Sequence, residues 1–294
     1  RRLDEGGAAA EAPAAAAPAV RSSLVRADEP VRVPPDLERH VVEIPDLRAI
    51  WPYLNRQFLY AKHLGVKGAV ARLEAERDPK FLEVEEVVRE VMRRCEAGWM
   101  RACGVYRFFK ANSEGNTLFV LDPAGRLLER FDFPRQPRKD GLCLADYVRP
   151  AGGEPDYVCF FVTTTGGGIR ERAEELKGRG EYLLSHTLQA LAIEAAEAFA
   201  EKLHRDLRTL WGFPDPPGLT MTDRFQAKYQ GVRVSFGYPA CPDLADQEKL
   251  FRLLRPEDVG VRLTEGHMMD PEASVSALVF HHSQAEYFNA SAAS

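Results

Sequence analysis

Apolar residues recur in steps of three or four over residues 181–211, which predicts one long amphipathic helix. Alanines beside this stripe would let another element approach the helix closely. The stripe consists of Leu184, Leu188, Leu191, Ala195, Phe199, Leu203, Leu207 and Leu210, and the flanking alanines are Ala192, Ala196 and Ala200.

Two earlier stretches also predict helices. Residues 50–64 form the first, where Pro52 is harmless because amides in the first turn lack helical partners anyway. Residues 81–99 form the second, with apolar side chains at helical spacing.

The period then changes to that of strands. Short β-rich runs separated by Gly, Asn and Asp predict an antiparallel meander, followed by a central apolar strand and two strands near the C-terminus. Helices grouped apart from such strands are typical of an α+β domain, so we expect an antiparallel β-sheet with flanking helices. The predicted strands are residues 104–111, 116–121, 126–133, 156–165, 261–266 and 274–282.

The first 40 residues differ in composition from the rest of the chain. Residues 8–19 are an Ala/Pro tract with nothing large enough to pack, and charged, proline-punctuated sequence continues to about residue 38. We therefore predict a flexible interdomain linker over residues 1–40 and a single C-terminal domain over residues 41–294. The chain starts at Arg1 without an initiator Met, which favours a piece of a longer polypeptide over a chain with a disordered tail of no role.

The charge and the apolar runs limit the possible binding partners, and the cysteine content indicates the cellular compartment. The net charge of −5 argues against nucleic acid, and no apolar run reaches the roughly 20 residues that cross a bilayer. The five cysteines are scattered, odd in number and without a CxxC pair, which is typical of reduced thiols in a cytoplasmic protein.

Residues 233–243, RVSFGYPACPD, are the most distinctive segment. We interpret them as an irregular loop in which Gly237 allows a tight turn and prolines fix the backbone. Arg233 offers a planar guanidinium suited to a carboxylate. The alternative is a proline-stiffened connection whose arginine is only surface charge.

The pattern RxxxGYPACPD resembles a signature of the activation domain of cobalamin-dependent methionine synthase. Further segments resemble that family in the expected order: residues 143–148 and 197–213 before the loop, and residues 271–288 after it. The resemblance spans about residues 41–288. Several separated matches in one order are more specific than a single motif.

The resemblance implies an antiparallel sheet that binds S-adenosylmethionine in a groove. By position, Arg233 would hold the ligand carboxylate, and Gly237, Tyr238 and Ala240 would line the groove, with Tyr238 also near the cobalamin face. Tyr287 and Phe288 match a pair of aromatic residues beside the ligand.

Two further positions are less clear-cut. Glu197 matches a ligand-facing carboxylate, although on a helical wheel it lies opposite the leucine stripe, on the face shared with His204. A cleft on that polar face would reconcile both observations. Asn55 falls where some relatives have aspartate, so a hydrogen-bond acceptor remains but the charge is lost.

The resemblance implies that this chain is the reactivation module of a methyltransferase. The module would present the methyl group of S-adenosylmethionine to reduced cobalamin, and it could not make methionine alone. Cobalamin and zinc would belong to other modules of the parent enzyme. The partners would be its cobalamin-binding module and a flavodoxin-like electron donor, with no nucleic acid or membrane. Because cobalt is the nucleophile, we expect no catalytic side chain and no metal site in this chain.

Other hypotheses remain open from the sequence. A freestanding methyltransferase, a sensing or docking module without methyl transfer and a purely structural module are the alternatives. The glycine run at residues 163–169 lacks P-loop or GxGxxG spacing, so a flexible connection is the better interpretation. His281 and His282, with His267 nearby, favour structural roles, because adjacent strand residues point to opposite faces.

Overall fold

The computed structural model describes residues 20–290 of the chain. Within that range one seven-stranded antiparallel sheet has the order β4-β3-β2-β5-β9-β6, with β1 also paired to β2, and β7 and β8 form a separate hairpin. The strands are β1 Arg39–Ile44, β2 Ala102–Glu114, β3 Thr117–Leu121, β4 Leu127–Asp132, β5 Asp156–Thr164, β6 Val232–Val234, β7 Arg262–Leu263, β8 Met269–Asp270 and β9 Ser274–Phe280.

The long strand β2 organises the sheet. Along one edge it pairs first with β1, from Ala102 to Arg107, and then with β3, from Lys110 to Glu114. Its other edge pairs with β5, which in turn pairs with β9. The predicted meander and central strand are confirmed, whereas the strand predicted at residues 261–266 is reduced to the two residues of β7.

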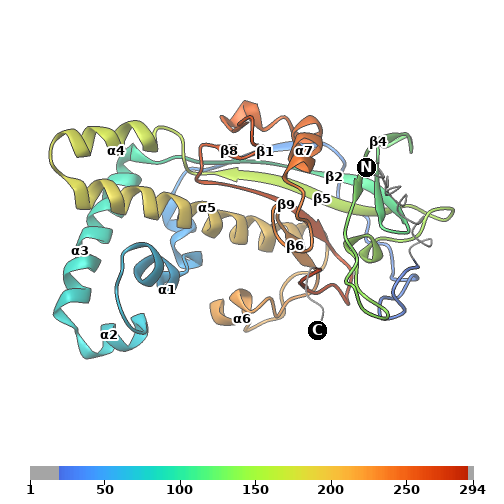
Figure 1. Ribbon diagram of the computed structural model, residues 1–294, viewed down its shortest axis with the longest axis horizontal. Helices are drawn as coiled ribbons and strands as arrows, with labels where there is room; N and C mark the ends of the chain where they lie inside the picture. Colours follow the sequence, from blue (N-terminus) through green and yellow to red (C-terminus); the bar gives the residue numbers. More distant parts are fainter. Residues whose placement is uncertain (1–19, 291–294) are drawn as a thin grey trace, which may run out of the picture.

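The sheet is buried on both faces, and alternation along each strand decides which core a residue joins. In β9, Ala277 and Val279 belong to one hydrophobic cluster, while Leu278 and Phe280 belong to the other. The first cluster lies against helix α5 and the second against helix α7, which covers the opposite face of the sheet (Figure 1).

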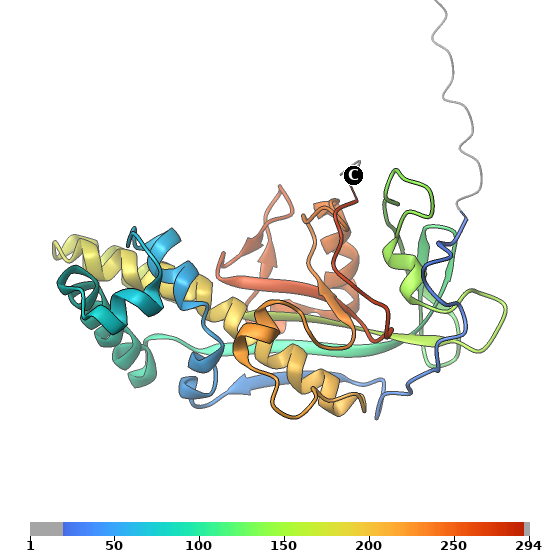
Figure 2. The same cartoon turned by 90° about the horizontal axis from the view of Figure 1, so that it is seen from below.

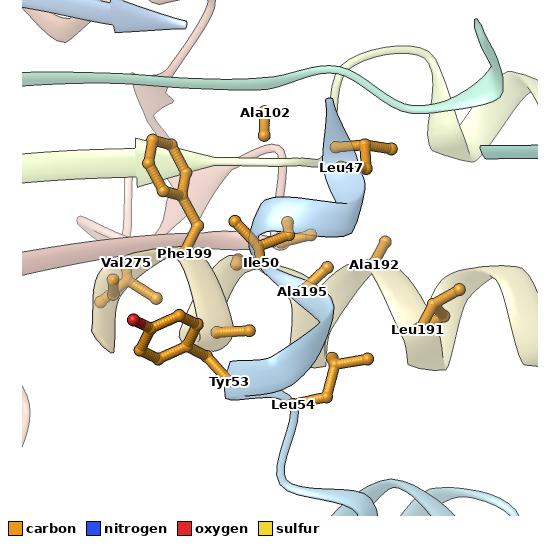
Figure 3. Close-up of a cluster of buried hydrophobic side chains, with 14 of the residues drawn as sticks. Leu47, Ile50, Tyr53, Leu54, Ala102, Leu191, Ala192, Ala195, Phe199 and Val275 are labelled. Carbon is orange, nitrogen blue, oxygen red and sulfur yellow. The ribbon is translucent and has the colours of Figure 1, made fainter. Parts of the chain in front are cut away.

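Helix α5 fulfils the prediction for residues 181–211 and is the longest element of the described chain. Its leucine and alanine stripe packs on the sheet and on the turns around Ile50, Tyr53 and Leu54 (Figure 3). Helices α2, α3 and α4 gather around its N-terminal half (Figure 1). The helices are α1 Arg56–Phe58, α2 Val70–Glu76, α3 Pro79–Arg94, α4 Ile169–Gly178, α5 Tyr182–Leu210, α6 Met221–Phe225 and α7 Gln247–Leu254.

The prediction of one helix over residues 50–64 was wrong. The chain forms a 3-10 turn at Trp51–Tyr53, becomes extended at Leu54 and begins again as the short helix α1. Asn55 caps that second start, because its Oδ1 accepts a hydrogen bond of 3.0 Å from the Phe58 amide. A π-helical turn, Leu59–His63, follows α1.

The described part of the predicted linker, residues 20–38, lies against the domain (Figure 2). Val25 is buried in the cluster that faces α7, and Arg32 accepts a hydrogen bond of 2.7 Å from the Trp211 indole through its carbonyl. Packing therefore starts earlier than residue 41. The Ala/Pro tract lies outside the described residues. Within residues 20–290, none of the helices combines the length and the apolarity needed to span a bilayer.

Candidate functional site

Four of the eight predicted site residues meet around one cavity of about 270 Å³. They are Asn55 before α1, Glu197 on α5, Arg233 on β6 and Tyr238 in the following loop. The remaining lining residues are Tyr53, Phe58, Glu194, Ala198, Glu201 and Phe225. The predicted cleft on the polar face of α5 is therefore present, and it reconciles the half-exposed position of Glu197 with a place at a cavity.

Arg233 lies on a strand, which corrects the interpretation of residues 233–243 as loop throughout. Its neighbours Val232 and Val234 point into the core that faces α7, so Arg233 points to the α5 side of the sheet. Its Nη1 is 3.4 Å from Glu197 Oε2, and its Nη2 is 3.6 Å from Glu201 Oε2. Burial acts to lower the pKa of Arg233, but these two carboxylates outweigh it and the pKa is raised.

Glu201 was missed in the sequence analysis, although its position four residues after Glu197 places it on the same helical face. Its side chain is only 9% exposed, and Oε1 has no hydrogen-bond partner among residues 20–290. Burial raises its pKa, against the lowering effect of Arg233 and Arg208. Glu201 thus places in the cavity lining a buried carboxyl group whose ionisation costs free energy.

The polar cluster continues behind Glu201 along α5. His204 is fully buried and packs edge-on against the Tyr229 ring, with centroids 5.2 Å apart. Arg208 lies over the same ring, 3.8 Å from its centroid, and its Nε is 2.7 Å from Asp215 Oδ1. Burial, assisted by the Glu201 charge, raises the pKa of Tyr229 to about 12.

Glu194 adds a third carboxylate from α5. Its Oε1 is 3.1 Å from His63 Nε2, and burial raises its pKa although this hydrogen bond opposes the change. Glu194, Glu197 and Glu201 thus present three carboxyl groups to a cavity whose lining contains one guanidinium, that of Arg233. Such a lining suits a ligand that combines one carboxylate with positive charge.

The loop after β6 is held by its own backbone. Gly237 has a positive φ of +86°, and its amide donates to the Cys241 carbonyl at 2.9 Å. A Cβ on Gly237 would meet the Leu244 side chain at 3.0 Å. Ala240 is fully buried in the core that faces α7, whereas Tyr238 is half-exposed at the cavity. Of these three loop residues, only Tyr238 lines the cavity.

The aromatic pair near the C-terminus does not line the cavity. Tyr287 is half-exposed, and its pKa is raised by burial and then by the nearby Tyr238. Phe288 is buried and packs edge-on against Tyr147, with ring centroids 6.3 Å apart. A ligand role for the pair therefore stays a prediction, in which Tyr287 is the one beside Tyr238.

The predicted structural histidines have separate partners. His281 Nε2 is 2.7 Å from Asp156 Oδ1, and His282 Nε2 is 3.0 Å from the Arg26 carbonyl oxygen. His267 instead pairs with Glu248. Across the described part of the chain, no cluster of three His, Cys, Asp or Glu side chains could hold a metal ion. The glycine run connects β5 to α4.

Comparisons with known proteins agree with the arrangement of sheet, helix and loop. The chain is 38% identical over 202 residues to methionine synthase of Mycobacterium tuberculosis (strain ATCC 25618 / H37Rv) and 37% identical over 204 residues to methionine synthase of Mycobacterium leprae (strain TN). Each match covers 64% of this chain and 17% of the relative. The chain therefore matches only about a sixth of the length of these curated relatives.

A crystal structure of the MetH reactivation domain bound to AdoHcy is similar to this fold, with a TM-score of 0.81 and 26% sequence identity. The likeness covers 88% of this chain and 83% of that one. The predicted fold of an antiparallel sheet with flanking helices is thus confirmed. Residues 49–293, most of the chain, match the family model described as vitamin B12 dependent methionine synthase, activation domain. The chain belongs to this activation-domain family.

Proposed function

We propose that the domain binds S-adenosylmethionine in the cavity at Arg233 and presents its methyl group to reduced cobalamin on another module of the same enzyme. The observation that carries the proposal is the charge arrangement of the cavity, where Arg233 pairs with Glu197 and Glu201 and a third carboxyl group of α5, that of Glu194, also lines the cavity. S-adenosylmethionine carries a carboxylate, an ammonium and a sulfonium, so each sign of charge has a counterpart. The related solved domain, bound to AdoHcy, holds the demethylated form of this ligand.

Each side chain then has a separate part in binding. Arg233 takes the carboxylate, and Glu197, the more exposed of its two partners, faces the positive groups. Asn55 offers an acceptor from the other wall of the cavity. Gly237 and Ala240 shape the loop that carries Tyr238, and Tyr287 with Phe288 would border the adenosine.

Reduced cobalamin on a docked module would supply the electron pair for the new bond to the methyl carbon. The electron pair of the broken carbon–sulfur bond stays on sulfur, which leaves a neutral thioether. No proton moves, so the cavity needs no general acid or base; it must hold the sulfonium in line with the acceptor. Tyr238, half-exposed at the cavity, and the half-exposed Tyr287 would meet the incoming module.

The wider assignment extends beyond this chain. The parent enzyme would be a methionine synthase whose other modules carry cobalamin and zinc, and a flavodoxin-like protein would supply the electron for reactivation. The vitamin B12 dependence named for the family supports a cobalamin-carrying module as partner. Five free cysteines, four of them buried, support a reducing cytoplasmic location.

Calorimetric titration of S-adenosylmethionine into the parent chain, Arg233→Ala and Arg170→Ala tests the proposal. Arg170 is a fitting control because its side chain is 70% exposed and pairs with Asp270, outside the cavity lining. We expect binding by the parent and the control, and a loss of at least about tenfold in Arg233→Ala, since a charge-assisted pair is removed. A folded parent that does not bind would overturn the assignment.

Methyl transfer is tested by adding the cobalamin-loaded neighbouring module and a reductant, then following the cobalamin absorbance and AdoHcy formation. Transfer by the parent supports a reactivation module. Binding that changes the affinity for the cobalamin module, without AdoHcy formation, would instead support a sensing or docking module.

A further inference from the structure

Residues 21–32, here named the strap, connect two segments that lie far apart in the sequence. They run beside the loops that follow β4 and along the chain end that follows β9 (Figure 2). That chain end, residues 281–288, is here named the C-terminal segment, and it carries Tyr287 and Phe288. The strap is therefore in a position to influence the aromatic pair.

Glu29 makes the most specific contact between the two. Its Oε1 accepts a hydrogen bond of 3.0 Å from the Ser283 amide, and its Oε2 accepts one of 2.9 Å from the Ser283 hydroxyl. Its side chain is only 5% exposed and also pairs with Arg26. Burial acts to raise the pKa of Glu29, but the Ser283 hydrogen bonds together with His282 and Arg26 outweigh it and the pKa is lowered.

Arg26 adds backbone contacts at the same place. Its amide donates to Gln284 Oε1 at 2.9 Å, and its carbonyl oxygen is 3.0 Å from His282 Nε2. Three consecutive residues of the C-terminal segment, from His282 to Gln284, are thus bonded to the strap. A segment bonded at successive residues opens less readily than one held at a single point.

The strap itself is fixed to the body of the domain. Arg149 Nε donates to the Glu29 carbonyl at 2.9 Å, Arg21 Nη1 donates to the Val148 carbonyl at 2.9 Å, and Val25 is buried in the core that faces α7. Glu29 therefore joins the C-terminal segment to a part of the chain that is itself fixed to the domain.

A second attachment lies further along the C-terminal segment. The Tyr147 hydroxyl donates to the Glu286 carbonyl at 3.1 Å and accepts from the Glu286 amide at 3.2 Å. Phe288 packs on the Tyr147 ring. Tyr287 lies between these contacts in the sequence and is half-exposed, and it interacts electrostatically with Tyr238, which lines the Arg233 cavity.

We propose that Glu29 is a positioning residue for ligand binding, which holds Ser283 and thereby keeps Tyr287 ordered beside Tyr238. The ligand consequence rests on the proposed function, whereas the ordering of the C-terminal segment by Glu29 does not.

The test compares Glu29→Ala, Glu29→Gln and Asp28→Asn in the full chain. Glutamine retains acceptor capacity without charge, and Asp28 is an exposed acidic neighbour that serves as the control. Hydrogen exchange at residues 282–287 is measured by mass spectrometry and NMR, together with thermal unfolding and the binding of S-adenosylmethionine and AdoHcy. The Ser283 amide reports directly on the contact, because it donates to Glu29.

For Glu29→Ala we expect at least about tenfold faster exchange confined to residues 282–287 and about fivefold weaker binding of both ligands. Glu29→Gln should be intermediate and Asp28→Asn unchanged. The equal loss for both ligands separates this role from a charge effect on the sulfonium.

The inference would be overturned by unchanged exchange at residues 282–287, or by faster exchange with unchanged affinity for both ligands. Exchange that rises equally over the whole sheet would show a general loss of stability and would overturn it as well. A folded parent that binds neither ligand contradicts the proposed function instead, and the exchange pattern then still decides whether Glu29 orders the segment.

Discussion

Arg233 and Glu201 form the innermost ion pair of the cavity, with 3.6 Å between Nη2 and Oε2. The two side chains differ in how many partners their polar atoms have. Arg233 also has Glu197 within 3.4 Å, whereas Glu201 Oε1 has no hydrogen-bond partner among the described residues. A buried carboxylate with one unsatisfied oxygen is costly to ionise, which agrees with its raised pKa.

The first prediction concerns stability and pH at Glu201. A carboxyl whose folded-state pKa is raised binds more protons folded than unfolded, so its contribution to stability falls as pH rises above its ordinary value of about 4.3. Denaturant unfolding of the parent and Glu201→Gln at several pH values from 4.5 to 7.5 measures this. The difference in unfolding free energy should shift in favour of the variant as pH rises; a constant difference would contradict the cost of ionisation.

Glu197 should separate the two forms of the ligand. Its side chain is 47% exposed, so its attraction for a sulfonium is screened and worth about 0.5–1 kcal/mol, or two- to fivefold in affinity. In Glu197→Gln we expect weaker binding of S-adenosylmethionine by this factor and a smaller change for AdoHcy, measured by parallel titrations. Equal losses for both ligands would show that Glu197 acts on the ammonium that both ligands share, or through Arg233, rather than on the sulfonium.

Asn55 offers the reverse experiment. Aspartate can replace asparagine as the cap of α1, because its carboxylate also accepts from the Phe58 amide. Asn55→Asp should therefore retain stability and strengthen S-adenosylmethionine binding by up to about fivefold, consistent with about 1 kcal/mol for one added charge near the surface. Asn55→Ala should lose about 1 kcal/mol of stability with the cap. Tighter AdoHcy binding by the same factor would exclude a charge effect on the sulfonium.

Helices and strands were predicted best where the helical or strand repeat of apolar residues ran without interruption. Helix α5 and strands β2, β5 and β9 were found because their apolar residues repeat over a long stretch. Residues 50–64 failed because Leu54 turns extended and Asn55 caps a new start, which a helical repeat of apolar residues does not reveal. Strand β6 was missed because its three residues are too few to show alternation.

The residues of the candidate site also differ in how well the sequence predicts them. Arg233, Tyr238 and Glu197 were found by resemblance, and the fold brings them to one cavity. Glu201 could have been found from its helical spacing to Glu197, but the burial that sets its ionisation depends on tertiary packing. Nothing in the sequence near Glu29 indicates its bonds to Ser283, because that contact joins positions more than 250 residues apart.

His204 should produce the opposite pH dependence to Glu201. Burial, with the nearby Arg208 and Arg233 charges, lowers its pKa well below the ordinary value, and Tyr229 packs against its ring. The unfolded state then binds more protons once pH falls below about 6.5, so stability is lost on acidification. His204→Leu should remove this part of the loss between pH 7 and pH 5.

The control for His204→Leu is the same change at His186, an exposed histidine of the same helix. At pH 7 the unfolding free energy of His204→Leu should stay within about 1.5 kcal/mol of the parent, since neither ring nitrogen of His204 has a hydrogen-bond partner within residues 20–290 and leucine has a similar volume. A pH profile parallel to that of the parent would show that His204 does not titrate as its burial requires.

The last prediction compares a buried with a partly exposed ion pair of helix α5. Asp215 is 7% exposed and bonds both the fully buried Arg208, at 2.7 Å, and Arg224, at 3.0 Å. Asp215→Ala would leave the Arg208 guanidinium buried without its carboxylate, which costs about 3–5 kcal/mol. Asp206→Ala removes a partly exposed carboxylate from the same helix and should cost less than about 1 kcal/mol. Denaturant unfolding measures both changes, and a loss at Asp215 as small as at Asp206 would show that Arg208 reaches another partner or solvent.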